Sequence, residues 1–126
     1  MSTTPTNAVS WLRHWSDVTA EEPADGIERR MVWGRRLMVC RLRFAPHVVV
    51  AVHTHPHEQF TLVERGRVRF EVDGEERLAS AGDVLYLPSN VPHGVTMLDE
   101  EVVLVDIFSP VRDDFLEGRA GGRGEG

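Results

Sequence analysis

The chain has no lysine, one cysteine and one tyrosine. The shortages of cysteine and of positive charge limit the kinds of cross-link and partner that the protein can have. A single cysteine, Cys40, excludes a disulfide within the chain, and its place in a strand-like apolar run favours a small buried residue over a nucleophile. No apolar run approaches the roughly 18 residues that a membrane-spanning helix requires. Positive charge is also scarce, because 14 arginines against 20 acidic residues leave a net charge of −6. We therefore expect neither nucleic acid nor a membrane as a partner.

Both ends of the chain have too little apolar content to pack. Residues 1–9 are small and polar and lack the basic start and apolar core of a signal peptide, so we expect a flexible N-terminus and a cytoplasmic location. Residues 117–126, EGRAGGRGEG, are rich in glycine and arginine, and we expect a disordered tail. This leaves one domain over residues 10–116, long enough to bury a sizeable core.

A short helical turn is predicted at the start of this domain. Trp11, Leu12 and Trp15 recur at roughly helical spacing, and Ser10 precedes them as a candidate N-cap. We expect the two tryptophans to pack together as an aromatic cover over one end of the domain.

From Ile27 onward the apolar residues recur with a period of two, which predicts strands. A hairpin is expected around Gly34, and Asp73-Gly74 is a strong signal for a second one. In the second arm of the first hairpin, one face carries Met38, Cys40, Leu42 and Phe44, and the other carries Arg41 and Arg43. VVVAVHTH (48–55) is expected to be a buried strand. Because turn signals recur throughout and no amphipathic helix of useful length occurs, the sequence predicts an all-β sandwich or closed barrel.

The segment HTHPHEQ (53–59) places three histidines within five positions. His53 and His55 are two residues apart on a strand, so both point to one face, and Gln59 can return to the same interior after Pro56. His93, in VPHGV, is the best candidate for a further ligand. Two or three imidazoles with an oxygen donor suit a divalent transition metal: Zn, Ni, Fe, Cu or Mn. The alternative is that the histidines are ordinary core or surface residues, although burying three of them without partners would be costly.

These residues resemble the two sequence motifs of the cupin family. His53-x-His55-x3-Gln59-x6-Gly66 is similar to the first motif, and Gly82-x5-Pro88-x-Asn90-x2-His93 to the second. The resemblance implies a double-stranded β-helix, a jelly-roll barrel, with one metal held by His53, His55, Gln59 and His93. His47 and Asn90 stand where the motifs usually have glycine, Met97 where asparagine is frequent, and Gln59 where glutamate is usual.

Gln59 bears on the chemistry of that metal. Three neutral imidazoles and a neutral amide leave the ion with its full charge, which favours a Lewis acid over a redox centre and weighs against a dioxygenase. The alternative is that glutamine marks a cupin that no longer binds metal tightly. His57 is expected at the rim of the site, and Glu58 should point away from it, toward a ligand histidine of the partner strand or an outer arginine.

A second group of candidates lies on the last long strand. Asp106 and Phe108 share one face of VDIFSPVRDDF (105–115), and Arg112 follows within reach of the barrel mouth. From the residues alone, Asp106 and Arg112 are either a structural pair beside a core Phe108, or an acid/base and a carboxylate clamp beside an apolar wall.

Asp106-x-Phe108-x3-Arg112 resembles the end of the KdgF-type small cupins, which linearise 4,5-unsaturated uronate monomers from pectin or alginate. That resemblance implies Asp106 and Arg112 as catalytic residues, Phe108 and Arg112 as contacts of a small anionic substrate, and one divalent metal (Zn, Ni, Fe or Mn). Thr61 stands where relatives often have a bulkier residue. Two alternatives remain open, a cupin-type polyketide cyclase and a non-catalytic cupin that binds a small anion or metal.

Since strands such as QFTLV are apolar on both faces, we also expect a homodimer.

Overall fold

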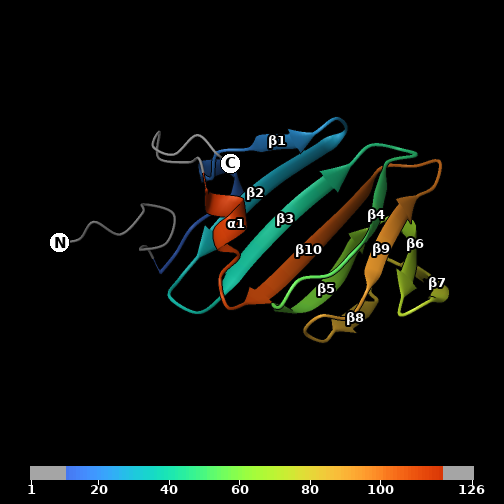
Figure 1. Cartoon of the computed structure of the whole chain (residues 1–126). Coiled ribbons are helices and arrows are strands. Elements are labelled where there is room, and N and C mark those ends of the chain that lie inside the picture. The colour runs from blue at the N-terminus through green and yellow to red at the C-terminus, as the bar shows by residue number, and fades with distance from the viewer. Residues whose placement is uncertain (1–10, 118–126) are drawn as a thin grey trace.

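The computed structural model describes residues 11–117, which form ten strands and two single helical turns (Figure 1). The strands are β1 (Glu21–Ala24), β2 (Ile27–Trp33), β3 (Met38–Phe44), β4 (Val49–His53), β5 (Glu58–Arg65), β6 (Arg67–Val72), β7 (Glu75–Ser80), β8 (Val84–Leu87), β9 (His93–Met97) and β10 (Val102–Ser109). A 3-10 turn, η2, spans Trp15–Asp17, and α1 spans Asp113–Leu116. The predicted flexible start at 1–9 and nearly all of the tail at 117–126 lie outside the described residues.

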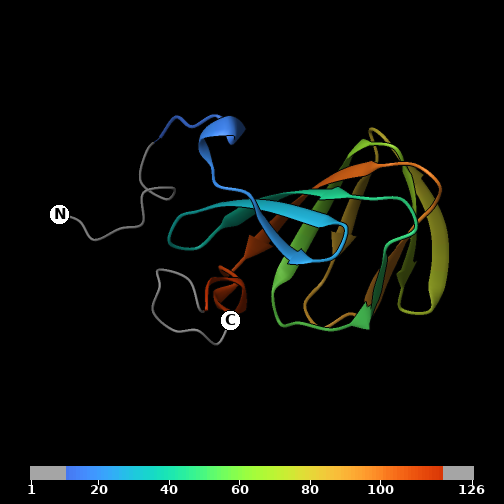
Figure 2. The same ribbon diagram turned by 90° about the horizontal axis from the view of Figure 1, so that it is seen from above.

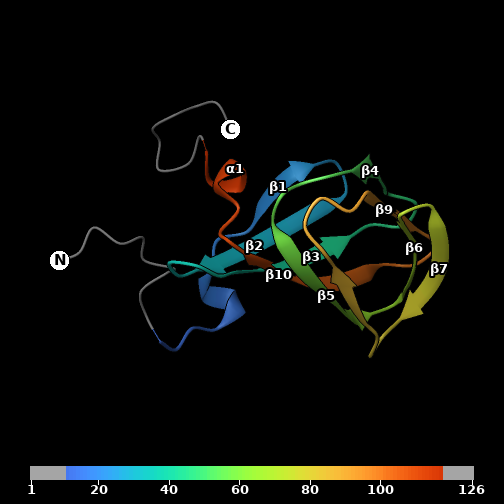
Figure 3. The same ribbon diagram turned by 60° about the horizontal axis from the view of Figure 1, so that its bottom comes forward.

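The strands form two antiparallel sheets that make the walls of a barrel (Figure 3). The six-stranded sheet has the order β1-β2-β3-β10-β5-β8, and the four-stranded sheet has the order β4-β9-β6-β7. Seen from above, the β2–β3 hairpin extends the larger sheet past the barrel, with η2 on one side and α1 on the other (Figure 2). The prediction of an all-β barrel is therefore confirmed. None of the helices within residues 11–117 is long and apolar enough to span a membrane.

Alternation along the strands fills the barrel from both sheets. On β3, Met38, Cys40 and Phe44 are buried and the arginines between them face outward, as the sequence predicted. One core cluster lies inside the barrel and consists of Phe44, Val63, Val68, Phe70, Ala79, Met97, Val102 and Leu104. A second lies between the β2–β3 extension and α1 and consists of Met31, Met38, Cys40, Phe108 and Val111. Burial raises the pKa of the Cys40 thiol, which keeps it protonated and agrees with the expected structural role.

Two expectations about burial are wrong. β4 is an edge strand that pairs only with β9, so Val49 and Val52 are 64% and 49% exposed, and only its inward residues pack on the core. The helical turn exists, but Trp11 is 94% exposed and does not form the predicted cover, whereas Trp15 is half-buried. His14 caps the turn by accepting a hydrogen bond from the Ser16 amide, and the predicted cap, Ser10, lies outside the described residues.

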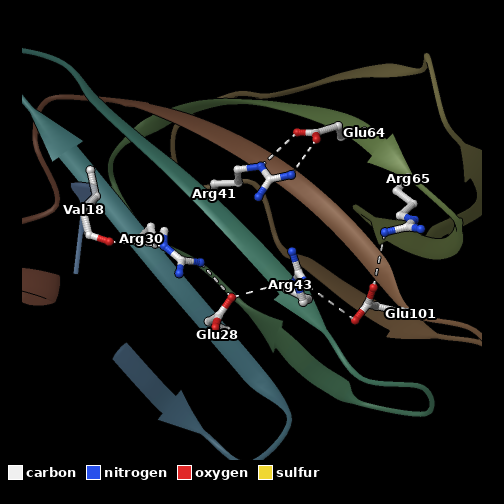
Figure 4. Close-up of polar contacts among 8 residues, drawn as sticks. All are labelled: Val18, Glu28, Arg30, Arg41, Arg43, Glu64, Arg65 and Glu101. Carbon is white, nitrogen blue, oxygen red and sulfur yellow. Dashed lines mark hydrogen bonds and ion pairs between the residues drawn. The ribbon is translucent and has the colours of Figure 1, made fainter. Parts of the chain in front are cut away.

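One half of the outer face of the six-stranded sheet carries paired charges (Figure 4). Arg41 donates to Glu64 through two nitrogens at 3.2 and 2.7 Å, and Arg30 donates to Glu28 at 2.9 Å. Glu101 lies 3.6 Å from Arg65 and 4.0 Å from Arg43. The four arginines drawn in Figure 4 each lie near one of three glutamates, which offsets most of the positive charge of this group.

Candidate metal centre and its cavity

Strand pairing brings three histidines together at one end of the barrel. His53 and His93 are opposite each other in the β4–β9 ladder, and His55 follows two residues after β4. Their ring centroids lie 4.5 Å apart for His53 and His93 and 4.9 Å apart for His55 and His93. One nitrogen from each of the three lies within 4.8 Å of the others. The structure thus joins the histidines that the sequence singled out from two distant segments.

Two of these imidazoles have a fixed tautomer. The Nδ1 of His53 lies 2.9 Å from the Ala51 carbonyl oxygen, and the Nδ1 of His93 lies 2.9 Å from the Val91 carbonyl oxygen. Because a carbonyl oxygen can only accept, each Nδ1 carries the proton and donates it. The Nε2 atoms are left with free lone pairs, and this is the arrangement found in metal-binding histidines.

Gln59 contributes an oxygen to the same point. It is an inward residue of β5 and is 6% exposed, and its Oε1 lies 3.0 Å from His55 Nε2. Two ligands that are each about 2.1 Å from one metal at a right angle lie about 3 Å apart. The spacing of this nitrogen and oxygen therefore suits neighbouring positions around one ion.

The electrostatics of His55 and His93 favour their neutral forms, as metal binding requires. Burial, together with the positive charges of Arg112 and His93, lowers the pKa of His55 to about 4. Burial also lowers the pKa of His93. Neutral imidazole is the form that binds metals, so the donor set fits a divalent transition metal.

Close packing explains the glycine after His93. A Cβ at Gly94 would lie 2.9 Å from the carbonyl oxygen of Val50 and 3.0 Å from the amide nitrogen of Val52. Any larger residue would push β4 away from β9 and would separate His53 from His93.

Asp106 faces the same interior from β10. It is opposite Thr61 in the β5–β10 ladder, and Thr61 Oγ1 donates a hydrogen bond of 2.7 Å to Asp106 Oδ1. Burial raises the pKa of Asp106 to about 6, although hydrogen bonding from Thr61 and Gln59 and the charge of Arg112 oppose the rise. A carboxyl group with such a pKa exchanges protons readily near neutral pH, as a general acid/base must.

Arg112 lies at the mouth of the cavity and is 8% exposed. Its guanidinium stacks on Phe108 at 4.9 Å and on Phe115 at 4.0 Å, and it donates to both oxygens of Asp114 at 3.0 and 2.8 Å. Arg112 therefore pairs with Asp114, whereas one of the two readings left open by the sequence paired it with Asp106. Phe108 is 2% exposed and belongs to the core, yet it also lines the cavity, so both readings of this residue hold in part.

Arg29 is a cavity residue that the sequence analysis missed. Arg29 lies on the inward face of β2, and its guanidinium stacks on the Phe115 ring at 4.1 Å, as that of Arg112 also does. It donates hydrogen bonds to Glu21 through Nε and Nη2 at 3.0 and 2.7 Å. The signal was present in the sequence. Arg29 alternates with Ile27 and Met31, and a charged residue on the apolar face of a strand indicates a polar site inside.

A single cavity of about 260 Å³ connects these groups. Its polar wall contains His53, His93, Gln59, Thr61, Asp106, Arg29 and Arg112. Its apolar wall contains Ile27, Leu42, Phe44, Val50, Phe70, Val95, Leu104, Phe108 and Phe115. The volume and the mixture of walls suit a small polar molecule with an acidic group.

The two residues between the ligand candidates lie outside this set. His57 is half-buried, with its ring 5.5 Å from that of His55 and 6.5 Å from that of Phe108, which agrees with a place at the rim. Glu58 points away from the centre, as parity predicted. Its partner is Tyr86, whose hydroxyl donates to it at 2.5 Å, so the expected histidine or arginine partner is wrong.

Comparison with known proteins agrees with this geometry. The sequence profile of the cupin domain matches residues 40–108. The pectin degradation protein KdgF of Dickeya dadantii is 39% identical over 98 residues, which cover 76% of this chain and 89% of that protein. The structure of KdgF from Halomonas sp. is similar with a TM-score of 0.76 and 32% identity, covering 80% of this chain and 94% of that one. An RmlC-like cupin from Shewanella frigidimarina NCIMB 400 has a TM-score of 0.81 and 29% identity, covering 86% and 98%.

Proposed function

The chain belongs to the cupin family, and from that premise we propose that it is a metal-dependent, non-redox enzyme that linearises 4,5-unsaturated uronate monosaccharides. The observation that carries the proposal is that two members of the histidine cluster, His53 and His93, border the same cavity as Asp106 and Arg112. The similarity to two KdgF proteins, over most of the chain in each case, supports the choice of substrate.

His53, His55, Gln59 and His93 would hold one divalent transition metal: Zn, Ni, Fe or Mn. When bound, such an ion supplies Lewis acidity, since four neutral ligands leave its charge undiminished. The histidines and the amide contribute by presenting lone pairs in a fixed arrangement and by excluding other orientations of the substrate oxygen.

Arg112 would bind the substrate carboxylate. Its pair with Asp114 uses Nε and Nη2, so it does not engage Nη1, and the stacking on Phe108 and Phe115 fixes the plane of the guanidinium. A planar donor group held in this way suits a planar carboxylate. Phe108 would contact the apolar edge of the sugar ring that carries the double bond.

Asp106 would move the proton that ring opening requires. As the bond between the anomeric carbon and the ring oxygen breaks, the anomeric hydroxyl loses its proton to Asp106 and becomes an aldehyde. The ring oxygen becomes a ketone, and the electrons of the double bond accept a proton from Asp106 at carbon 4. The net change is an isomerisation, with one proton taken up and one returned, so no oxidant or co-substrate is needed.

The test uses an unsaturated galacturonate monomer and follows the loss of absorbance of its conjugated double bond. We expect Asp106→Asn to lower the rate by about 100-fold or more, the usual effect of losing a general acid/base. Glu64→Gln is the matched control, because that carboxyl group lies on the outer face of the sheet and its loss should leave the rate unchanged. The uronate mechanism is wrong if Asp106→Asn equals the wild type or if the wild type does not exceed buffer.

We also propose that two copies associate through the outer face of the six-stranded sheet. One row across five strands of this face is apolar and consists of Val32, Val39, Ile107, Phe60 and Tyr86, which are aligned by the strand register. Phe60 and Tyr86 are 44% and 49% exposed, and their ring centroids are 5.1 Å apart. A second copy would remove this row from water. The cytoplasmic location expected from the sequence stays a prediction.

A further inference from the structure

Three polar contacts connect the histidine cluster with Asp106 through two inward side chains of β5. His55 Nε2 and Gln59 Oε1 lie 3.0 Å apart, Gln59 Nε2 donates to Thr61 Oγ1 at 2.8 Å, and Thr61 Oγ1 donates to Asp106 Oδ1 at 2.7 Å. Thr61 has no exposed surface and is the backbone partner of Asp106 across the ladder. The middle of this series is therefore held in place by the sheet itself.

Counting donors and acceptors shows which group donates in each hydrogen bond between Gln59, Thr61 and Asp106. The Thr61 hydroxyl has one hydrogen, and the Asp106 carboxylate can only accept, so that hydrogen is committed to Asp106. The Thr61 oxygen is then left as an acceptor, and the amide nitrogen is the only part of Gln59 that can donate to it. It follows that the Gln59 oxygen faces the histidines.

The reversed amide is unfavourable at both of its ends. It would place Gln59 Oε1 against the lone pairs of Thr61 Oγ1, leaving two buried acceptors without a hydrogen. It would also turn an NH2 group, which cannot bind a cation, toward the Nε2 atom of His55.

We propose that Thr61 is a positioning residue of the metal centre, whose hydroxyl, held by Asp106, keeps the oxygen of the Gln59 amide turned toward the metal. This rests on the metal centre proposed above but does not depend on the uronate substrate. Thr61 has this orienting role because the ligand at position 59 is an amide, whose two ends differ. A glutamate at position 59 would present an oxygen at either end and would need no such orientation.

The experiment measures the affinity of chelator-treated protein for Co²⁺ and the visible absorption of the bound ion. Thr61→Val keeps the shape of the side chain but removes the hydroxyl, and we expect about tenfold weaker binding, as is common for residues that orient a ligand. The Co²⁺ absorption band should change as well, because an oxygen ligand is lost or displaced. Thr61→Ser keeps the hydroxyl and should restore both the affinity and the spectrum.

The same substitution in a Gln59→Glu background separates orientation from packing. Thr61→Val should weaken Co²⁺ binding in the wild-type background and have little effect when residue 59 is changed to Glu. Equal weakening in both backgrounds would show that Thr61 acts only through packing and would overturn the proposal.

Asp106 allows the series to be tested from its other end if Thr61→Val does not fold. Asp106→Leu removes the acceptor, which frees the Thr61 hydrogen to hold the Gln59 oxygen, so Co²⁺ binding should weaken. Asp106→Asn keeps an acceptor oxygen and loses only the charge, so Co²⁺ should bind more tightly to it than to Asp106→Leu. Equal affinities for these two variants would contradict the orienting role.

Failure of this proposal is distinguishable from failure of the proposed function. Wild-type protein that binds Co²⁺ no better than Thr61→Val overturns the role of Thr61 and leaves the metal centre standing. Wild-type protein that binds no Co²⁺ overturns both the centre and the role of Thr61. Absence of uronate turnover, with the affinity pattern intact, overturns only the substrate.

Discussion

Charged side chains on the inward faces of strands define this molecule at the scale of single residues. Arg29 on β2 and Asp106 on β10 stand at positions where alternation would otherwise place an apolar core residue. Each is compensated locally, Arg29 by Glu21 and Asp106 by Thr61. Burying charged groups costs free energy even when they have partners, and a functional role for both in one cavity is the simplest explanation for keeping them there.

Replacing Arg112 tests the carboxylate clamp. Arg112→Lys keeps the positive charge but loses the planar fork and the stacking on Phe108 and Phe115. We expect KM for the unsaturated uronate to rise at least about tenfold, the equivalent of one hydrogen bond to a charged group, with a smaller change in kcat. Steady-state kinetics measures both values. Arg41→Lys on the outer face is the control, and an unchanged KM for Arg112→Lys would remove the clamp from the mechanism.

At the scale of elements, two turns with a left-handed backbone coincide with two of the departures from the family motifs. His47 and Asn90 have φ angles of 69° and 67°, in the left-handed region that glycine adopts without strain. They are the two positions at which the resembled motifs usually have glycine. Both positions therefore have the backbone geometry that glycine favours, although neither residue is a glycine.

Glycine at position 47 should therefore stabilise the protein. His47→Gly removes left-handed strain, and after allowance for the greater freedom of the unfolded chain we expect a gain of about 0.5–1 kcal/mol. In thermal unfolding this corresponds to a rise in Tm of roughly 2–5 °C for a domain of this size. His47→Ala removes the imidazole but keeps the strained φ, so it should show no such gain. Equal Tm values for the two variants would show that the backbone is not strained there.

The limits of prediction from sequence also belong to the elements. The β2–β3 hairpin and the Asp73-Gly74 turn were predictable because alternation and turn residues are local signals. β1 was missed, since Glu-Glu-Pro-Ala has no alternation and forms a strand only by pairing with β2. β4 was expected to be buried because its valines suggested a central strand, whereas its place at the edge of a sheet depends on topology.

The residues of the candidate site also fall into those that local sequence patterns predict and those that depend on the tertiary structure. Spacing on one strand joined His53 with His55, and the residues around them also indicated Gln59 and His93. The resemblance to known motifs then chose between the two readings of Asp106 and Arg112. The partners of these residues could not be predicted. Thr61 between Gln59 and Asp106, and Asp114 beside Arg112, depend on which strands are neighbours and on side-chain conformations that no local pattern encodes.

At the scale of the whole molecule, the six-stranded sheet has two different faces. Its inner face carries the cavity, and its outer face carries an apolar row beside a set of matched charges (Figure 4). A row that crosses five strands, with Phe60 and Tyr86 exposed and Val32, Val39 and Ile107 half-buried, is more than the scattered apolar residues of an ordinary surface. Two such faces related by a two-fold axis would cover each other, and the cavities would remain accessible on the far sides.

Light scattering coupled to size exclusion tests this arrangement. We expect wild-type protein to elute as a dimer and Phe60→Glu to elute as a monomer, because a buried unpaired carboxylate would oppose association. Leu78→Glu is the matched control: Leu78 is 54% exposed, but it lies on β7 of the other sheet, so this variant should remain dimeric. A clean monomer for the wild type would remove the homodimer.

The most direct test of the central claim is the rate of uronate linearisation before and after removal of the metal. The account predicts that chelator-treated protein, freed of chelator, no longer accelerates the loss of the conjugated double bond. One equivalent of a divalent transition metal per chain should restore the rate, and His93→Ala should not respond to the added metal. Metal-stripped protein that remains as active as untreated protein would contradict the account.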